Sequence, residues 1–270
     1  MIKYGIIGAG WRSEFYLRIS ALLPNEFSVS GIYIRSSEKQ KKFADKYNAK
    51  ICRSLEELLK TDFDFIVSCV NKDNISEMIK TLTAKNIPVL TETPVTDGTL
   101  TGRVQVAEQF HFMPRNQAYK RIIESGILGE VHSVRLSCCH DYHAASLIRF
   151  FLDTGFEKPE ITSISLTAPV TRYNSRAGYL NPPAVIPAEE KIKVFKFKTK
   201  TAIYDFSFEQ YFSDIRSSQI IIRGTNGEIT NNTCTYLKNG VPQRFEIRRN
   251  AYGVGESLDG MCLFNITGNG

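Results

Sequence analysis

Two short segments of this chain contain residue types whose spacing could support chemistry. The first, Gly8–Gly10, is a Gly-Ala-Gly turn directly after an apolar run near the N-terminus. The second, His140–His143, places two histidines around an aspartate and a tyrosine. A glycine turn between a strand and a helix lets a phosphate approach the backbone, and histidine is the side chain best suited to proton transfer near neutral pH. The sequence therefore predicts a phosphate-bearing cofactor and an acid–base reaction.

The glycine turn has the features of a dinucleotide-binding loop. Gly8 can form the tight turn, and Gly10 carries no side chain that would block a pyrophosphate. The predicted helix that follows offers N–H groups and the positive end of its dipole to that pyrophosphate. Trp11 and Arg12, in its first turn, are therefore further candidate contacts. Ser13 replaces the third glycine of the usual pattern, and a plain tight turn is the alternative interpretation.

The residues after the second predicted strand bear on which nicotinamide cofactor binds. An acidic residue there would bind the ribose hydroxyls of NAD, but the position holds Ile34. Arg35 and Ser36 could instead hold a 2′-phosphate, because a guanidinium matches the geometry of phosphate. The sequence therefore favours NADP over NAD, with a solvated surface arginine as the alternative. The neighbouring basic cluster 39–42 is expected on the wet face of a helix.

The composition is that of an ordinary globular chain. Of 270 residues, 42% are hydrophobic and 23% are charged, and the formal net charge is +6. No apolar stretch reaches the ~20 residues that a membrane-spanning helix needs, and no nucleic-acid-binding motif accompanies the mild basic excess. The chain begins on a strand-like run with no signal peptide. We therefore expect a cytoplasmic protein with reduced cysteines, no membrane contact and no nucleic-acid partner.

The first third of the chain alternates between strand and helix patterns. Apolar runs of strand length are separated by helical segments, which is typical of a parallel sheet with helices on both faces. The predicted strands are Ile2–Ile7, Phe27–Ile34, Phe63–Val70 and Pro88–Glu92. The predicted helices are Trp11–Leu23, Glu38–Tyr47 and one that Asn74 could cap and that ends near Lys85.

The segment Arg103–Phe112 interrupts this alternation. It has the pattern of a strand that places Glu108 among valines and phenylalanines, which indicates either a sheet edge or a site. We predict that Glu108 and His111 line a substrate pocket. Only Val95–Gly102 separates this strand from Pro94, whereas a parallel crossover normally needs a dozen or more residues. Either the strand is not a parallel neighbour of the preceding one, or a helix has been lost.

The remainder of the chain has the pattern of an α+β domain dominated by antiparallel sheet. Asn-Gly pairs at 226–227 and 239–240 are strong hairpin signals, and Tyr173–Pro187, which contains two adjacent prolines, is expected to be a loop. The predicted helices are Arg115–Glu124 and Ala144–Leu152, and the predicted strands are Val131–Cys138, Ile161–Val170, Lys193–Thr199, Ala202–Phe208, Gln219–Arg223, Glu228–Thr230, Cys234–Leu237 and Arg244–Arg248. We predict a dinucleotide-binding domain over 1–113 and a substrate and oligomerisation domain over 114–270. The second domain ends without a closing helix, as a truncated one would.

Three further motifs accompany the glycine turn. They are Ser68–Asn71 after one predicted strand, Leu90–Pro94 after the next, and Gly126–Val131, a Gly-x-Leu-Gly-x-Val run. Together the four resemble the glucose–fructose oxidoreductase and inositol dehydrogenase family (Gfo/Idh/MocA). The resemblance implies a Rossmann doubly wound parallel sheet followed by an α+β domain with a mainly antiparallel open sheet. In this family that open sheet often forms the interface of a homodimer or homotetramer.

The resemblance also implies a reaction and roles for particular residues. Val70, Asn71 and Glu92 would contact NADP or NAD. The reaction would be hydride transfer between the nicotinamide and a sugar-like or other small hydroxyl or carbonyl substrate. Thr93 stands where the family has a lysine that polarises or deprotonates the reacting hydroxyl, and a threonine can donate a hydrogen bond but supplies no cation. His143 matches the family's histidine.

The histidine segment supplies the remaining site candidates. His143 and Tyr142 are predicted to act on the transferred proton, and His140 is predicted to contact the substrate. Cys139 stands at the family's aspartate position. Cys139, His140 and His143 are also zinc-type ligands, but no fourth ligand is evident, so no metal is predicted.

Two functional hypotheses follow from these observations. In the first, the protein is an NAD(P)-dependent oxidoreductase. In the second, it binds the cofactor as a sensor or partner subunit without transferring a hydride, because Thr93 and Cys139 replace the family's catalytic residues.

Overall fold

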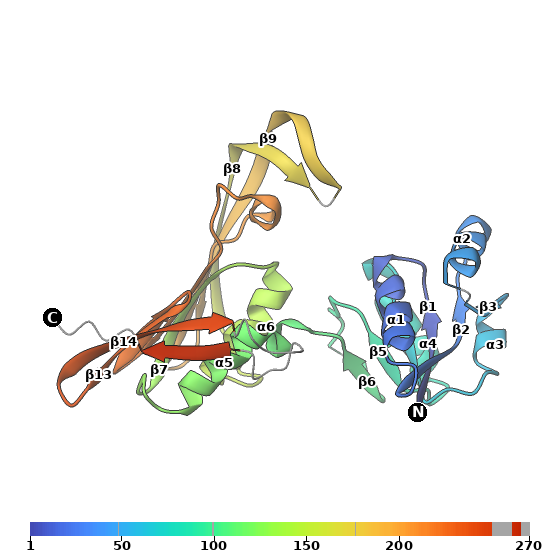
Figure 1. Cartoon of the computed structure of the whole chain (residues 1–270), viewed down its shortest axis with the longest axis horizontal. Helices are drawn as coiled ribbons and strands as arrows, with labels where there is room; N and C mark the ends of the chain where they lie inside the picture. Colours follow the sequence, from blue (N-terminus) through green and yellow to red (C-terminus); the bar gives the residue numbers. More distant parts are fainter. Residues whose placement is uncertain (48, 99, 176, 250–260, 266–270) are drawn as a thin grey trace. The chain divides into compact units, whose positions relative to one another are not determined.

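The computed structural model describes residues 1–47, 49–98, 100–175, 177–249 and 261–265. The chain forms two compact units, Met1–Glu108 and Gln109–Gly270, which Figure 1 colours along the sequence. None of the helices in the described ranges is both long and apolar enough to cross a membrane.

The first unit is built on a six-stranded sheet in the order β3-β2-β1-β4-β5-β6, and every strand pairing in it is parallel. This is the order of a doubly wound dinucleotide-binding fold, whose ligand crevice lies where the strand order reverses, between β1 and β4. The strands are β1 (Ile2–Ile7), β2 (Phe27–Tyr33), β3 (Ile51–Cys52), β4 (Phe65–Ser68), β5 (Val89–Thr91) and β6 (Val104–Val106), and the helices are α1 (Trp11–Leu22), α2 (Ser37–Tyr47), α3 (Leu55–Leu58), η1 (Lys72–Asn74) and α4 (Ile75–Thr83).

Strand β1 shows why this sheet is covered on both faces. Successive side chains of a strand point to opposite faces. Tyr4 and Ile6 join one buried cluster with Leu17 of α1, while Ile7 joins a second cluster with Leu58 of α3. The apolar run that predicted a buried parallel strand is therefore explained by helices on either side.

Strand β6 decides between the two alternatives for the segment after Pro94. It pairs in parallel with β5, with Val89 opposite Val104, and the described residues between the two strands contain no helix. The crossover has thus lost its helix. The predicted strand Arg103–Phe112 was too long, because β6 ends at Val106 and Phe110–Phe112 forms the 3-10 turn η2.

Turn η2 also explains where the two units divide. The ring of Phe110 packs against His143 at 4.3 Å between centroids, and the ring of His111 stacks on Phe150 at 4.7 Å. Residues 109–113 therefore group with the second unit, and the division lies five residues before the expected 113/114 boundary.

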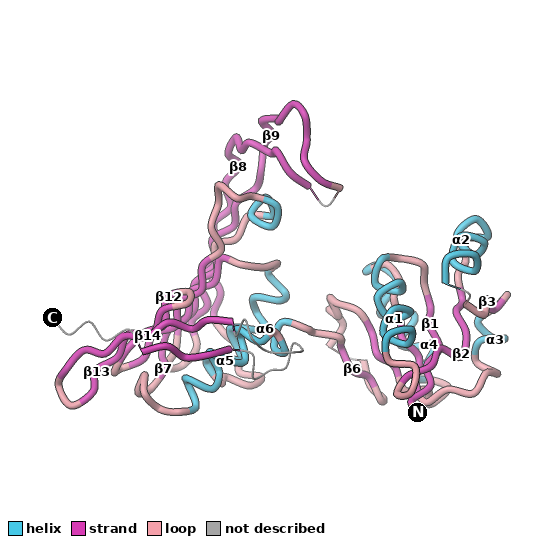
Figure 2. Tube along the Cα trace, viewed as in Figure 1, coloured by secondary structure: helices cyan, strands magenta, loops and turns pink. Residues whose placement is uncertain are grey.

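The second unit is a nine-stranded sheet in the order β15-β14-β13-β12-β11-β7-β10-β9-β8. All its neighbouring strands are antiparallel except β7 and β10, which confirms the predicted mainly antiparallel sheet. Figure 2 shows the helices beside it. The strands are β7 (Val131–Ser137), β8 (Glu160–Ser175), β9 (Gly178–Lys196), β10 (Thr201–Tyr204), β11 (Gln219–Gly224), β12 (Gly227–Thr230), β13 (Thr233–Lys238), β14 (Val241–Arg249) and β15 (Met261–Asn265), and the helices are α5 (Pro114–Glu124), α6 (Asp141–Leu152) and η3 (Phe208–Phe212).

The core of the second unit lies between α5, α6 and the sheet. Tyr119 of α5 and Phe151 of α6 are almost completely buried and pack in one cluster with Leu136 of β7 and Ile222 of β11. Helix α6 begins at Asp141, three residues before the predicted start at Ala144.

The prediction that Tyr173–Pro187 forms a loop was wrong. Strands β8 and β9 form one long hairpin, in which Pro169 lies opposite Pro187, and its outer part extends away from α5 and α6 (Figures 1 and 2). On β9 the side chains of residues 181–185 are exposed on both faces, whereas on β8 residues 172–175 are half-buried. The predicted Asn-Gly turn at 239–240 is confirmed, because Asn239 and Gly240 have φ angles of 52° and 77°, as a tight hairpin turn requires.

Candidate functional site

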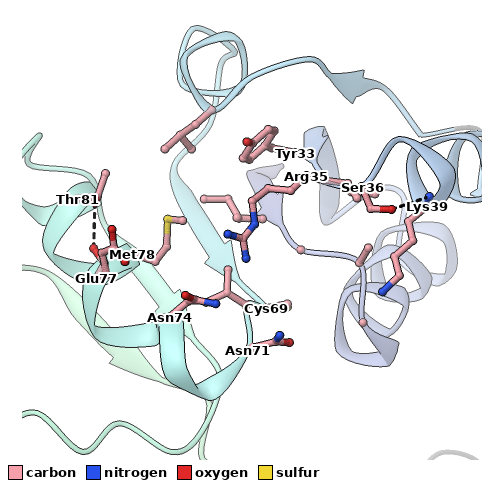
Figure 3. A pocket seen from close by; sticks show the side chains of 17 residues that line it. Tyr33, Arg35, Ser36, Lys39, Cys69, Asn71, Asn74, Glu77, Met78 and Thr81 are labelled. Carbon is pink, nitrogen blue, oxygen red and sulfur yellow. Dashed lines mark hydrogen bonds between the residues drawn. The ribbon is translucent and has the colours of Figure 1, made fainter.

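A cavity of about 430 Å³ lies at the carboxyl ends of β1, β2 and β4, where the strand order reverses (Figure 3). Of the predicted cofactor-binding residues, Gly8, Gly10, Arg35, Ser36, Val70 and Asn71 line it. The glycine loop, the end of β2 and the segment after β4 thus meet around one space. This is the position in which doubly wound folds hold a dinucleotide.

The two glycines of the loop have different physical roles. Gly8 has a φ of +118°, and a Cβ on it would lie 2.4 Å from the carbonyl oxygen of Cys69, so any side chain would clash. Gly10 has an ordinary φ of −90°, and a Cβ there would meet nothing within 4 Å. Gly8 is therefore needed by the fold, whereas the absent side chain of Gly10 leaves open space at the start of α1.

Two cations line the cavity near the start of α2. Arg35 reaches into it from the end of β2, and Lys39 approaches from the first turn of the helix (Figure 3). The Ser36 hydroxyl accepts the N–H of Lys39 at 3.4 Å. Ile34 is 2% exposed, so the position that would carry the ribose-binding acid holds a buried apolar side chain.

Sequence reasoning missed Lys39 and one face of α4. Lys39 was expected on the wet face of a helix, but it lines the cavity. Asn74, Glu77, Met78 and Thr81 also line it, at spacings of three and four residues, which place them on one helix face. A stripe of this spacing beside the buried residues of α4, directly after Asn71, is a signal that could have revealed them.

Glu92, Trp11 and Arg12 lie outside the cavity lining. Glu92 is 8% exposed and follows β5. Its Oε2 lies 2.8 Å from Nε of Arg12, and its Oε1 accepts the Tyr16 hydroxyl at 3.1 Å. The Arg12 guanidinium lies over the ring of Trp11 at 4.9 Å. Thr93, the predicted replacement for the family's lysine, is the next residue and is half-buried.

The Glu92 carboxylate affects the acidity of its neighbours. Burial, with the nearby charge of Glu92, raises the pKa of the Cys69 thiol to about 12. Burial and the same carboxylate also raise the pKa of the Tyr16 hydroxyl above its ordinary value. Both groups therefore keep their protons at neutral pH, and Tyr16 serves as a hydrogen-bond donor to Glu92.

The predicted histidine segment lies at the start of α6 in the second unit. His143 is 8% exposed, and its ring packs against those of Phe110 and Tyr142, with a centroid distance of 4.3 Å to each. His140 precedes the helix as its N-cap residue, and its backbone N–H donates to the Tyr211 hydroxyl at 2.8 Å. The His140 ring stacks on both Tyr142 and Phe208.

A charged pair lies beside these histidines. Nζ of Lys193, on β9, is 3.0 Å from Oδ2 of Asp141 and lies over the Tyr204 ring at 5.9 Å. Burial opposes ionisation of Asp141, but the hydrogen bond and charge of Lys193 hold its pKa below the ordinary value. The start of α6 therefore carries an ionised aspartate near neutral pH.

His111 contacts the same helix one turn further along. Its Nε2 lies 2.7 Å from the Ser146 hydroxyl oxygen, and its ring stacks on Phe150. Glu108, the other predicted wall residue, ends the first unit and is half-buried. The second unit thus brings His111, His140 and His143 to one helix, whereas Thr93 and Glu108 belong to the first unit. In the described ranges, no three histidine, cysteine, aspartate or glutamate side chains are grouped as a set of metal ligands.

Comparison with known proteins gives a family-model match over the first unit. Residues 2–111 match the model of the Gfo/Idh/MocA oxidoreductase family, NAD-binding Rossmann fold. The chain is 29% identical over 92 residues to L-aspartate dehydrogenase of Methanocaldococcus jannaschii, covering 33% of this chain and 34% of that protein. It is 28% identical over 153 residues to L-aspartate dehydrogenase of Methanococcus maripaludis, covering 53% and 57% respectively. The matched segments thus span between about a third and just over half of these relatives' lengths.

Among solved structures, the fold is similar to an oxidoreductase from Agrobacterium radiobacter in complex with NAD+, L-tartaric acid and magnesium. The TM-score is 0.67 at 16% identity, and the similarity covers 90% of this chain and 78% of that one. This similarity extends the agreement in fold to both units. With its parallel six-stranded sheet, its glycine loop and the match over residues 2–111, the first unit has the NAD-binding Rossmann fold of the Gfo/Idh/MocA oxidoreductase family.

Proposed function

We propose that this protein is an NAD(P)-dependent oxidoreductase that transfers a hydride between the nicotinamide and a small hydroxyl or carbonyl substrate. The observation that carries the proposal is the cavity at the reversal of strand order, with Gly8 and Gly10 on its wall. The open space beside Gly10 fits a group that approaches the backbone closely, as a pyrophosphate does. When bound, the nicotinamide supplies or takes up the hydride.

The cavity residues favour NADP over NAD. Arg35 and Lys39 supply two cations at the place where the adenosine ribose is held in this fold, and Ser36 adds a hydroxyl between them. A guanidinium binds phosphate oxygens through paired hydrogen bonds. Ile34, buried where an acid would bind the 2′-hydroxyl of NAD, removes the usual preference for the unphosphorylated cofactor.

Titration of the protein with NADPH and with NADH, followed by nicotinamide fluorescence, tests this preference. Arg35→Ala and Lys39→Ala should each lower the affinity for NADPH by about tenfold, since a charge-assisted hydrogen bond contributes roughly 1.5 kcal/mol or more. NADH affinity should change little. Lys41→Ala, on the same helix but outside the cavity lining, is the matched control. If NADPH and NADH bind with equal affinity and neither variant changes it, the 2′-phosphate site is excluded. If neither cofactor binds, the proposed function is excluded.

The proton transfer is assigned to the histidine segment. His143 gives up or accepts a proton at a ring nitrogen, and Tyr142, whose ring packs on it, is the second candidate donor. Thr93, in the first unit, donates a hydrogen bond to the reacting oxygen. His140, His111 and Glu108 are assigned to substrate contact.

Acidic small molecules join sugars and polyols as candidate substrates. The curated relatives are L-aspartate dehydrogenases, and the Agrobacterium oxidoreductase is a complex with L-tartaric acid. The assay panel therefore includes hydroxy acids and L-aspartate beside sugars and polyols, with NADP and NAD each offered as the oxidant. If the natural protein converts substrates of one class and His143→Gln does not, the result supports the proposed oxidoreductase activity.

A second candidate function is cofactor binding without turnover, as a sensor or partner subunit. Thr93 favours it, because the lysine expected at this position is absent. In that case Thr93→Lys should create turnover on candidate substrates that the natural protein does not convert, with NADPH affinity retained. Robust turnover by the natural protein would exclude this function.

We also infer a homodimer or homotetramer that acts in the cytoplasm. The apolar side chains of Ile161, Ile164 and Val194 on β8 and β9 are exposed. The cysteines at positions 52, 69, 138, 139 and 234 are free thiols, as in a reducing compartment. Light scattering during gel filtration tests the assembly, and fractionation of the source cells tests the location. A monomer at micromolar concentration, or recovery outside the cytoplasm, would contradict these inferences.

A further inference from the structure

Cys138 and Cys139 occupy the junction between β7 and α6. Their Sγ atoms lie 3.7 Å apart, so the two side chains turn toward each other, although successive side chains of a strand point to opposite faces. Cys139 is completely buried in the core of the second unit, and Cys138 is half-buried against it. Cys138 is thus the more exposed of the two residues, and the sulfur of Cys139 lies next to its own.

The surroundings favour reaction at Cys138. The hydrogen bond with Cys139 and the positive charge of Arg115 lower the pKa of the Cys138 thiol, although burial opposes this shift. By contrast, burial raises the pKa of Cys234 to about 12. Because the thiolate is the nucleophile toward peroxides, Cys138 should react well before Cys234.

We propose that Cys138 and Cys139 form a hydroperoxide-sensitive pair that closes to a disulfide between adjacent residues. The thiolate of Cys138 attacks a peroxide oxygen and the O–O bond breaks. Cys138 becomes a sulfenic acid, and the peroxide, with one proton taken up, is reduced to water or an alcohol. The Cys139 thiol then attacks the Cys138 sulfur, the S–S bond forms, and the sulfenic oxygen leaves as water. The two sulfurs together lose two electrons to the peroxide.

The position of the pair makes the disulfide reversible and gives it a structural consequence. Neighbouring Cα atoms are about 3.8 Å apart, closer than the roughly 4.4–6.8 Å of ordinary disulfides, so the bond is strained and easily reduced. The next residue, His140, is the N-cap residue of α6, and its backbone N–H donates a hydrogen bond to the Tyr211 hydroxyl. Oxidation therefore changes the backbone directly before the histidine segment.

Peptide mass spectrometry of the full-length protein tests the proposal. The protein is treated with hydrogen peroxide, quenched with catalase, unfolded in the presence of iodoacetamide and digested with trypsin. The tryptic peptide Leu136–Arg149 contains both cysteines and no other. We expect it to be unalkylated and lighter than the dithiol form by two hydrogen atoms, and to become doubly alkylated after dithiothreitol. Cys234 in the same sample should remain alkylatable.

Two variants separate this chemistry from simple overoxidation. In Cys139→Ser, Cys138 should gain oxygen atoms under the same treatment, because no second thiol captures the sulfenic acid. In Cys138→Ser, Cys139 should remain alkylatable. The proposal is overturned if the natural peptide gains oxygen as Cys139→Ser does, if it is cross-linked to another cysteine peptide, or if both its thiols survive peroxide. None of these outcomes depends on hydride transfer or cofactor binding.

Discussion

Nε of Arg12 lies 2.8 Å from Oε2 of Glu92, and this ion pair joins the first turn of α1 to the residue after β5. The two side chains are only 14% and 11% exposed. Tyr16, one turn further along α1, donates its hydroxyl to the other carboxylate oxygen. The pair therefore fixes the segment that carries Thr93 to the helix whose start faces the glycine loop.

Removal of either partner should destabilise the protein more than removal of both. Breaking a buried ion pair leaves an uncompensated charge and costs about 3–5 kcal/mol, whereas replacing both partners is often nearly neutral. We expect Glu92→Gln and Arg12→Met each to lower the urea midpoint clearly, and the double variant to recover part of the loss. A double-mutant cycle measures the coupling free energy, and additive effects of the two changes would contradict this account.

Two alanine substitutions in the glycine loop should affect different quantities, one the stability of the fold and the other the affinity for NADPH. Gly8→Ala should destabilise the fold, because positive φ alone costs about 1–3 kcal/mol and the Cβ would clash with the Cys69 carbonyl. Gly10→Ala should leave the free energy of unfolding nearly unchanged, since its Cβ meets nothing within 4 Å. Gly10→Ala should nevertheless lower the affinity for NADPH, because the methyl group takes space beside the pyrophosphate. Urea unfolding and fluorescence titration separate the effects, and full NADPH affinity in Gly10→Ala would argue against the proposed pyrophosphate position.

The first unit could be predicted largely from the sequence because its strands are buried on both faces. Such strands are continuous apolar runs, as in Ile2–Ile7, and the glycine loop then locates the reversal of strand order. Lys39 was not predicted to line the cavity. Its position one helical turn after Arg35 depends on α2 beginning at Ser37, and a basic cluster on the sequence does not indicate which member faces inward.

The outer hairpin of the second unit could not be predicted in the same way. A strand exposed on both faces lacks the alternating apolar pattern by which strands are identified, and Pro182 and Pro183 are ordinarily evidence against a strand. The structure nevertheless places both prolines within β9. The predicted start of α6, Ala144, lies three residues too far along the chain for a related reason. Asp141 is stabilised at the helix N-terminus by the dipole and by Lys193 on β9, and that contact depends on the tertiary fold.

Acid should weaken the contact between β8 and η3. Arg172 donates two hydrogen bonds to the Glu209 carboxylate. The hydrogen bond with Arg172, supported by its charge, lowers the pKa of Glu209 below the ordinary value of 4.5. A lowered pKa in the folded state adds stability that is fully present above pH 4.5 and is lost as the pH falls through the folded-state value. Glu209→Gln should therefore be less stable than the natural protein at pH 7, with a difference that shrinks toward pH 3. Urea midpoints across this range check it, and a constant difference would mean that Glu209 acts through packing alone.

His143→Gln should reduce turnover without altering cofactor affinity. A general acid–base group typically contributes about 10²–10⁴-fold to the rate, and His143 lies in α6 of the second unit, whereas the cavity-lining residues belong to the first. Glutamine preserves a hydrogen-bonding side chain of similar size, so packing against Phe110 and Tyr142 should largely persist. The control is Ser146→Ala, which removes the hydrogen bond to His111 and should raise KM more than it lowers kcat. Steady-state kinetics should therefore show a loss of kcat of at least about tenfold in His143→Gln and a nearly natural kcat in Ser146→Ala. If His143→Gln keeps the natural kcat, the proton is carried by another group.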